Sequence, residues 1–148
     1  IDLYGIHGDF PSIAEAEYLR QDAHARVEFL EAAWCRDIGD DRFIPYIQLH
    51  EFEALLFTNP SDLSLFYTNS GAQIRRLQAI SESVDSPEQI NDGADTAPSK
   101  RIISELPDYK GAKRIVGPMV AELIGLHQIR ARCPHFNAWL TRLEALAQ

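Results

Sequence analysis

One histidine and two glutamates lie close together near the middle of the chain, in the run Leu49-His50-Glu51-Phe52-Glu53. They come where an apolar, strand-like stretch gives way to a helix-forming one, so the three polar side chains can converge on one crevice. A second histidine at position 54 would complete a zinc-protease motif, but Ala54 stands there, which excludes a metalloprotease of that type. The alternative is structural, because acidic side chains in the first turn of a helix are stabilised by its positive dipole end.

A second group of polar residues, Asp2, His7 and Asp9, surrounds two glycines at the start of the chain. An acidic residue at the end of a parallel strand points into the crevice above the sheet, where α/β proteins place their sites. Carboxylates there can hold Mg²⁺, which prefers oxygen ligands. The alternative is that Asp2 and Asp9 only shape a turn.

The third group could bind phosphate. Small and hydroxyl-bearing residues at a predicted helix start, followed by cations, form an anion site because the first backbone N–H groups of a helix are free. Further cations in the last third of the chain could extend a path for a polyanion. The predicted phosphate-binding residues are Ser99, Lys100, Arg101, Lys113, Arg130 and Arg132. The alternative is that these cations only balance an acidic body.

Composition limits the class of protein. The 148 residues carry a net charge of −8, which argues against non-specific coating of nucleic acid. Residues 1–99 hold 6 basic and 18 acidic side chains, whereas residues 100–148 hold 8 and 4, so only the last third suits a polyanion. Two distant cysteines and no apolar run of about 20 residues lead us to expect a reduced, cytoplasmic protein without a membrane span. Because Ile1 opens what is predicted to be a strand, we expect a longer parent chain.

The elements that would position these residues are mostly helices. Apolar residues spaced three or four apart predict a long helix from Ser12 to about Arg36, capped by Ser12. Aromatic and β-branched residues predict a strand over residues 43–49. Later helices are predicted from Ala97, from Lys113 to Ile124, and after Pro134. A strand, a helix and a strand followed by helices predict an α/β fold, part of a parallel sheet with a helical extension.

The chain resembles a bacterial family known as a domain of unknown function (4276). The resemblance rests on Asp2-Leu3-Tyr4-Gly5 with Asp9-Phe10-Pro11, and above all on the string from Phe43 to Phe57. Three later stretches extend it across nearly the whole chain: Ile90–Gly93, Ala97–Ile102 and Ile129–Phe136. The family is similar to Toprim domains, the α/β metal-binding fold of topoisomerases, primases and old-family nucleases.

This resemblance implies a fold and a function. It implies that residues 1–57 are the C-terminal part of a Toprim-like, Rossmann-like domain and that residues 58–148 are a helical extension packed on the same core. It implies that Asp2 is one site acid and that Glu51 or Glu53 is another. Together with the polar groups above, this leads us to predict a Mg²⁺ or Mn²⁺ site with Asp2, Asp9 and Glu51 as ligands and with Glu51, His50 and Glu53 in catalysis. Tyr4 replaces the second acid of the usual Toprim pair.

The implied activity is metal-dependent hydrolysis of nucleic acid, tRNA among the targets, by the effector of an anti-phage defence system with a partner ATPase. Self-association stays open. The rival interpretation is a non-catalytic subunit that docks on the ATPase through apolar helix faces, such as that of Ile115, Val116, Val120 and Ile124.

Overall fold

The protein is built from helices joined by extended segments. The computed structural model describes residues 1–90 and 96–146, and 69% of the chain is helical. The chain divides into two compact units, residues 1–49 with 135–148 and residues 50–134, here called unit 1 and unit 2. No helix within the described residues is both long and apolar enough to span a bilayer. The predicted division after Phe57 falls inside a 3-10 helix of unit 2.

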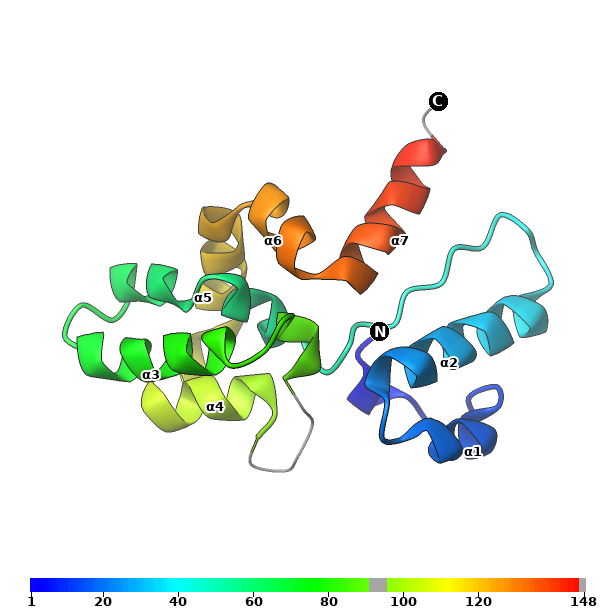
Figure 1. Cartoon of the computed structure of the whole chain (residues 1–148), viewed down its shortest axis with the longest axis horizontal. Coiled ribbons are helices and arrows are strands. Elements are labelled where there is room, and N and C mark those ends of the chain that lie inside the picture. The colour runs from blue at the N-terminus through cyan, green and yellow to red at the C-terminus, as the bar shows by residue number, and fades with distance from the viewer. Residues whose placement is uncertain (91–95, 147–148) are drawn as a thin grey trace. The chain divides into compact units, whose positions relative to one another are not determined.

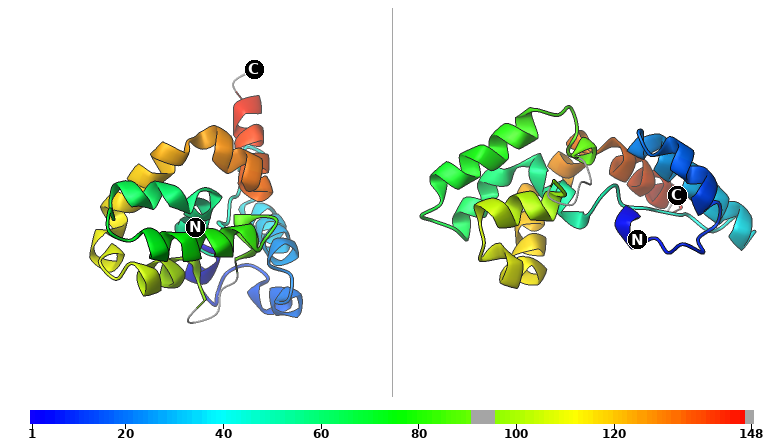
Figure 2. Two further views of the ribbon diagram at one scale, coloured as in Figure 1. Left: turned by 60° about the vertical axis from the view of Figure 1, so that its left-hand side comes forward. Right: turned by 90° about the horizontal axis from the view of Figure 1, so that it is seen from below.

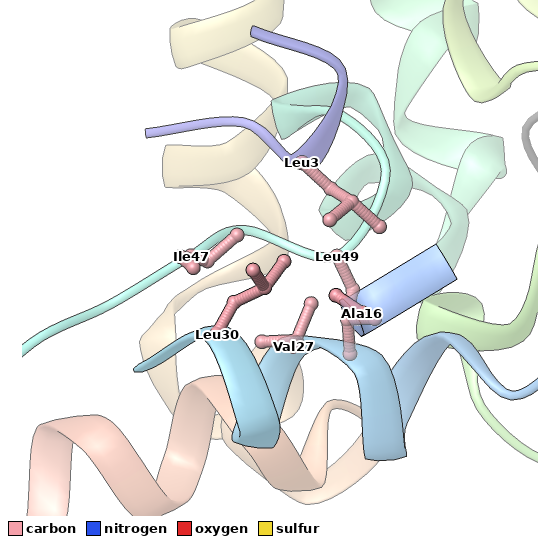
Figure 3. Packing of buried hydrophobic residues seen from close by; sticks show 6 residues of the cluster. All are labelled: Leu3, Ala16, Val27, Leu30, Ile47 and Leu49. Atoms are coloured by element: carbon pink, nitrogen blue, oxygen red, sulfur yellow. The ribbon is translucent and has the colours of Figure 1, made fainter. Parts of the chain in front are cut away.

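Unit 1 contains two α-helices of the N-terminal part, the last α-helix of the chain, and short 3-10 turns. Their bounds are η1 (Leu3–Gly5), α1 (Ile13–Ala16), η2 (Glu17–Leu19), α2 (Ala23–Ile38) and α7 (Pro134–Ala145). The core forms where α2 packs on the extended segment that ends at Leu49. Figure 3 shows Val27 and Leu30 of α2 directed towards Ile47 and Leu49, with Leu3 and Ala16 completing the cluster.

The predicted parallel sheet is wrong. Within the described residues the only β pairing is one isolated parallel bridge between Asp2 and Gln48, and Figures 1 and 2 show helices and connecting segments without an arrow. Two backbone hydrogen bonds make the bridge: Leu3 N–H donates to the Gln48 carbonyl, and Gln48 N–H donates to the Ile1 carbonyl. A partial Toprim-like or Rossmann-like sheet is therefore not the fold of this chain.

The sequence of residues 43–49 explains why a strand-like pattern does not give a strand. Pro45 has no N–H to contribute to a ladder. Two residues after Pro45, the Ile47 N–H donates a hydrogen bond to the Glu31 carboxylate of α2 at 2.7 Å rather than to a neighbouring strand. After the bridge the two segments diverge, because the chain enters η1 at Leu3 and adopts a left-handed conformation at His50 (φ 64°).

The long helix predicted over residues 12–36 is interrupted. Ser12 is left-handed (φ 57°) and its side chain does not cap α1. The cap lies instead at Asp22, whose carboxylate accepts a hydrogen bond from the Ala25 backbone N–H at 3.0 Å and begins α2. Gly39 ends α2 in the left-handed conformation that glycine adopts at low cost.

Unit 2 is a stack of short helices around η3 (Phe52–Thr58). The others are η4 (Pro60–Leu65), α3 (Gly71–Glu82), η5 (Pro87–Gln89), α4 (Pro98–Glu105), α5 (Tyr109–Ile124) and α6 (Leu126–Arg132). All of η3 after Phe52 is buried, and α3, α4, α5 and α6 all contact it. Figure 1 shows α3 and α4 side by side. The starts predicted at Ala97 and after Pro134, and the end predicted at Gly125, are confirmed.

Candidate functional site

The predicted Glu51 and Glu53 are both fixed by the buried helix η3. Glu51 stands just before η3 in an extended conformation, and Glu53 lies in its first turn. Because Ala54, Leu55, Leu56 and Phe57 are almost completely buried, the helix has little freedom to turn the acids away from the interior. Glu53 is only 6% exposed and His50 only 3%. An apolar anchor therefore positions the polar residues.

Glu51 binds the beginning of α4, 48 residues further along the chain. Its two carboxylate oxygens accept hydrogen bonds from the Ser99 backbone N–H at 2.9 Å and from the Ser99 hydroxyl at 3.1 Å. The N-cap residue of α4 is Ala97, whose side chain has no acceptor, and Pro98 has no N–H. Glu51 thus replaces the missing cap and places its charge at the positive end of the helix. Two of the predicted functional residues are brought together by this contact.

Glu53 faces α5 and forms an ion pair with Lys113. The Lys113 Nζ to Glu53 Oε1 distance is 3.5 Å, with the lysine side chain half-exposed and the glutamate buried. Taking a carboxylate out of water costs free energy unless a partner compensates it. Lys113, at the rim, offsets part of that cost.

Tyr109 lies beside both acids, and its buried hydroxyl makes no hydrogen bond of standard geometry among the described residues, although it is close enough to Glu53 for a hydrogen bond to that carboxylate to contribute to its pKa. Burial raises the pKa of Tyr109 above its ordinary value, and the charges of Glu53 and, more weakly, Glu51 raise it further. The room for the ring comes from Gly117, where an added Cβ would meet the Tyr109 hydroxyl oxygen at 3.1 Å.

The predicted phosphate-binding residues have different roles. Arg101 Nε donates to the Thr96 carbonyl at 2.7 Å, and Arg132 donates to the Ser81 carbonyl at 3.2 Å, so both hold the fold of unit 2. Arg130 is half-buried. Lys100 is exposed on the first turn of α4, one residue after Ser99. Of the set, Lys100 and Lys113 are best placed to meet an anion near Glu51 and Glu53.

The other predicted ligands belong to unit 1. Asp9 and His7 are almost fully exposed and 3.5 Å apart, and Asp2 takes part in the bridge with Gln48. Within residues 1–90 and 96–146 no group of three acidic, histidine or cysteine side chains is close enough to hold one metal ion. Asp2 and Asp9 belong to unit 1 and Glu51 belongs to unit 2. A metal site that combines these three carboxylates therefore stays a prediction.

The sequence analysis missed two buried side chains of unit 2. Glu88 is completely buried although it stands in a Ser-Pro-Glu-Gln run typical of a helix start, and nothing in that run marks its burial. Tyr109 comes two residues after Pro107, and only the nearby Gly117 hinted that a large group needs space.

Comparison with known proteins gives one match. A family model described as Domain of unknown function (DUF4276) matches residues 1–144. No curated protein and no solved structure matches the chain.

Proposed function

For this chain, which belongs to the DUF4276 family, we propose Mg²⁺-dependent hydrolysis of phosphodiester bonds in nucleic acid. The observation that supports the proposal best is the pair Glu51 and Glu53, held beside Ser99, Lys113 and the buried hydroxyl of Tyr109. Charged groups buried at a cost in stability are typical of functional sites. The proposal does not depend on a Toprim sheet.

The donor atoms suit magnesium. Mg²⁺ is commonly held by one or two carboxylates, with water and substrate phosphate completing its shell. Glu51 and Glu53 supply the carboxylates, and their oxygens keep lone pairs beyond those used by Ser99 and Lys113. The buried Tyr109 hydroxyl supplies a further polar group. The residues present therefore fit a two-carboxylate site for this ion.

The chain's own residues have separate tasks in this scheme. A bound Mg²⁺ supplies Lewis acidity towards the phosphoryl oxygen and lowers the pKa of water. Lys100 and Lys113 bind the substrate phosphate, and Glu51 and Glu53 would hold the ion. Ser99 orients Glu51 through its two hydrogen bonds. His50 is buried at the start of the segment and fixes its direction.

The biological setting in the proposal follows the family resemblance. We place the activity in an anti-phage defence system, as an effector that acts with a partner ATPase. RNA, with tRNA first, is the substrate class to test, followed by DNA. The basic last third of the chain favours a polyanionic substrate over an uncharged one.

The test is cleavage of labelled tRNA and DNA by the longest available parent chain, with Mg²⁺ or Mn²⁺ and with EDTA. Cleavage is expected to stop in EDTA and to fall at least about 100-fold in Glu53→Gln and Glu51→Gln. The matched control is Glu122→Gln, an exposed glutamate of α5, which should cleave like the unchanged protein. Unchanged cleavage in both site variants, with thermal melting showing a folded protein, would remove these residues from the mechanism.

A second candidate, a non-catalytic subunit that docks on the ATPase, is favoured by one feature of α5. Ile115, Met119 and Leu123 recur every fourth residue and are 68%, 46% and 47% exposed. They form an apolar stripe on one side of the helix. The stripe differs from the surface first predicted, because Val116, Val120 and Ile124 are buried core residues.

The stripe can be tested separately from catalysis. Replacing Met119 and Leu123 by serine should weaken association of the chain with the ATPase and leave melting almost unchanged, because both side chains are exposed. Loss of association with intact cleavage would give the chain both roles. Intact association would show that the stripe is not the docking surface.

A further inference from the structure

Unit 1 carries a groove that uses none of the residues in the proposed hydrolytic site. It encloses about 310 Å³ and lies between one face of α2 and α7, which lines it from the first turn to the last, and Pro45 also lines it. The α2 side chains are one or two turns apart on a single face: Glu28, Glu31, Ala32 and Cys35. The α7 side chains are His135, Ala138, Trp139 and Arg142. The volume is that of a small-molecule site.

The aromatic wall of the groove is prearranged. The Tyr46 ring stacks on His135, with ring centroids 5.4 Å apart, and on Trp139, with centroids 4.5 Å apart. His135 Nε2 is 3.1 Å from Glu31 Oε1, and the same Glu31 oxygen accepts the Ile47 N–H. Trp139 is thus supported from behind by a fixed stack while part of its surface lines the groove. A preformed wall lowers the entropic cost of binding.

The two ends of the groove carry opposite charges. Glu28 and Arg142 are exposed, and among the residues that the structure describes neither has an ion pair or hydrogen bond. Glu31, one turn after Glu28, adds negative charge at the same end. Arg142 lies at the other end, and with Cys35 it also lines an adjoining hollow of about 400 Å³, to which Arg36, Asp40 and Asp41 contribute and where Arg42 pairs with Asp40. From Glu28 to Cys35 the helix rises about 10 Å.

We propose that this groove binds a basic amino acid residue with a free carboxylate, either as arginine itself or at the end of a peptide. The guanidinium lies against Trp139 and pairs with Glu28, because a cation is attracted both to an indole and to a carboxylate. The carboxylate pairs with Arg142, whose planar guanidinium matches it in a bidentate way. The aliphatic stem lies along Ala32, Ala138 and Pro45. An acidic ligand or a nucleotide is disfavoured because its charge would meet Glu28 and Glu31.

The test is calorimetric titration of the whole chain with two matched probes, L-arginine and agmatine, which is arginine without its carboxylate. L-Arginine is expected to bind saturably and about tenfold more tightly than agmatine, since one charge-assisted pair is lost. Arg142→Gln should reduce arginine binding to the agmatine level and leave agmatine binding unchanged. Glu28→Gln should weaken both probes. Arg75→Gln, an exposed arginine of α3, is the control and should change neither.

Two further probes separate the sources of the ligand. The peptide Gly-Gly-Arg with a free carboxylate, compared with its amide, tests a peptide end, and binding of either free arginine or the free-acid peptide supports the site. Because Glu28 and Arg142 are exposed, their variants should melt like the unchanged protein. The proposal is overturned if no probe binds saturably, or if arginine binds equally well to Arg142→Gln.

Discussion

The two units of this protein bury different kinds of side chain. The core of unit 1 is aliphatic, and Gln48 is its one strongly buried polar residue in the described part of the chain. Unit 2 buries seven polar or charged side chains in the same description: His50, Glu53, Thr58, Ser81, Ser86, Glu88 and Ser99. Both units have apolar cores, but unit 2 also buries a set of polar and charged side chains that must find partners inside it.

Apolar burial and polar burial bear differently on stability and on function. Apolar burial stabilises a fold with few demands on geometry, whereas buried polar groups stabilise it only when each finds a partner. In unit 2 the acids before and within η3 are held by Ser99 and Lys113, and the Tyr109 hydroxyl is buried beside them. We infer that the buried polar groups around η3 in unit 2 serve a chemical function. In unit 1, the surface groove is the candidate functional feature.

The largest expected effect tests the apolar core of unit 1. Leu30→Ala removes a fully buried side chain of α2 and should lower the free energy of unfolding by about 3 kcal/mol. Urea denaturation measures the loss, and hydrogen exchange should locate it in α2. Ile38→Ala, at the half-exposed end of the same helix, is the control and should cost less than about 1 kcal/mol. Equal losses would contradict the core described for unit 1.

The next effect tests the contact between Glu51 and α4. Glu51→Ala removes both hydrogen bonds to Ser99 and should cost about 2 kcal/mol, since it leaves the start of α4 without a cap. Ser99→Ala removes only the hydroxyl bond and should cost about half as much. Hydrogen exchange at the first turn of α4 measures both. Equal protection in all three proteins would show that Glu51 does not cap this helix.

A smaller effect of opposite sign tests the buried Tyr109 hydroxyl. Tyr109→Phe removes a buried polar group that makes no hydrogen bond of standard geometry among the described residues, so it should stabilise the protein by about 1 kcal/mol unless the Glu53 carboxylate beside it accepts the hydroxyl proton. Thermal melting without added metal is the measurement. Tyr18→Phe, at a side chain that is 92% exposed, should change nothing. Destabilisation by Tyr109→Phe would mean that the hydroxyl is bound in solution, by the Glu53 carboxylate or by an internal water.

The smallest expected effect is a difference in labelling rate between the two cysteines, one in each unit. Burial, together with the charge of Glu88, raises the pKa of Cys133 to about 12, so its thiol stays protonated at neutral pH. Cys35 is half-exposed in the groove of unit 1. Ellman's reagent at about pH 8 should label Cys35 first and Cys133 only on unfolding, because the thiolate is the reactive form. Equal labelling rates in the folded protein would place Cys133 at the surface.

Part of the fold could be predicted from local signals. Pro98 and Gly125 mark helix ends by their own backbone chemistry, and both ends are found as predicted. The strand predicted over residues 43–49 was wrong because a strand-like sequence pattern reflects burial and side-chain shape. It does not show that a neighbouring strand is present. Glu31 accepts the Ile47 N–H that a neighbouring strand would otherwise bind. This residue is 16 positions away in the sequence, and no local pattern marks it as the partner.

The candidate site was predictable in its residue types but not in its contacts. Glu51 and Ser99 were both singled out, yet their pairing depends on the absence of a side-chain acceptor at Ala97 and on the packing of η3 against α4. The cations were predicted as a phosphate path by charge alone. Charge does not show that Arg101 and Arg132 are used to bind backbone carbonyls.

The close approach of Gly117 to Tyr109 has a consequence for the history of the family. A glycine inside a helix costs about 1 kcal/mol relative to alanine, and α5 carries one here because an added Cβ would meet the Tyr109 hydroxyl at 3.1 Å and the Phe52 ring at 3.4 Å. When phenylalanine replaces the tyrosine, the closer of these two contacts disappears. We therefore expect positions 109 and 117 to covary among related sequences, with alanine at 117 accompanying the loss of the hydroxyl.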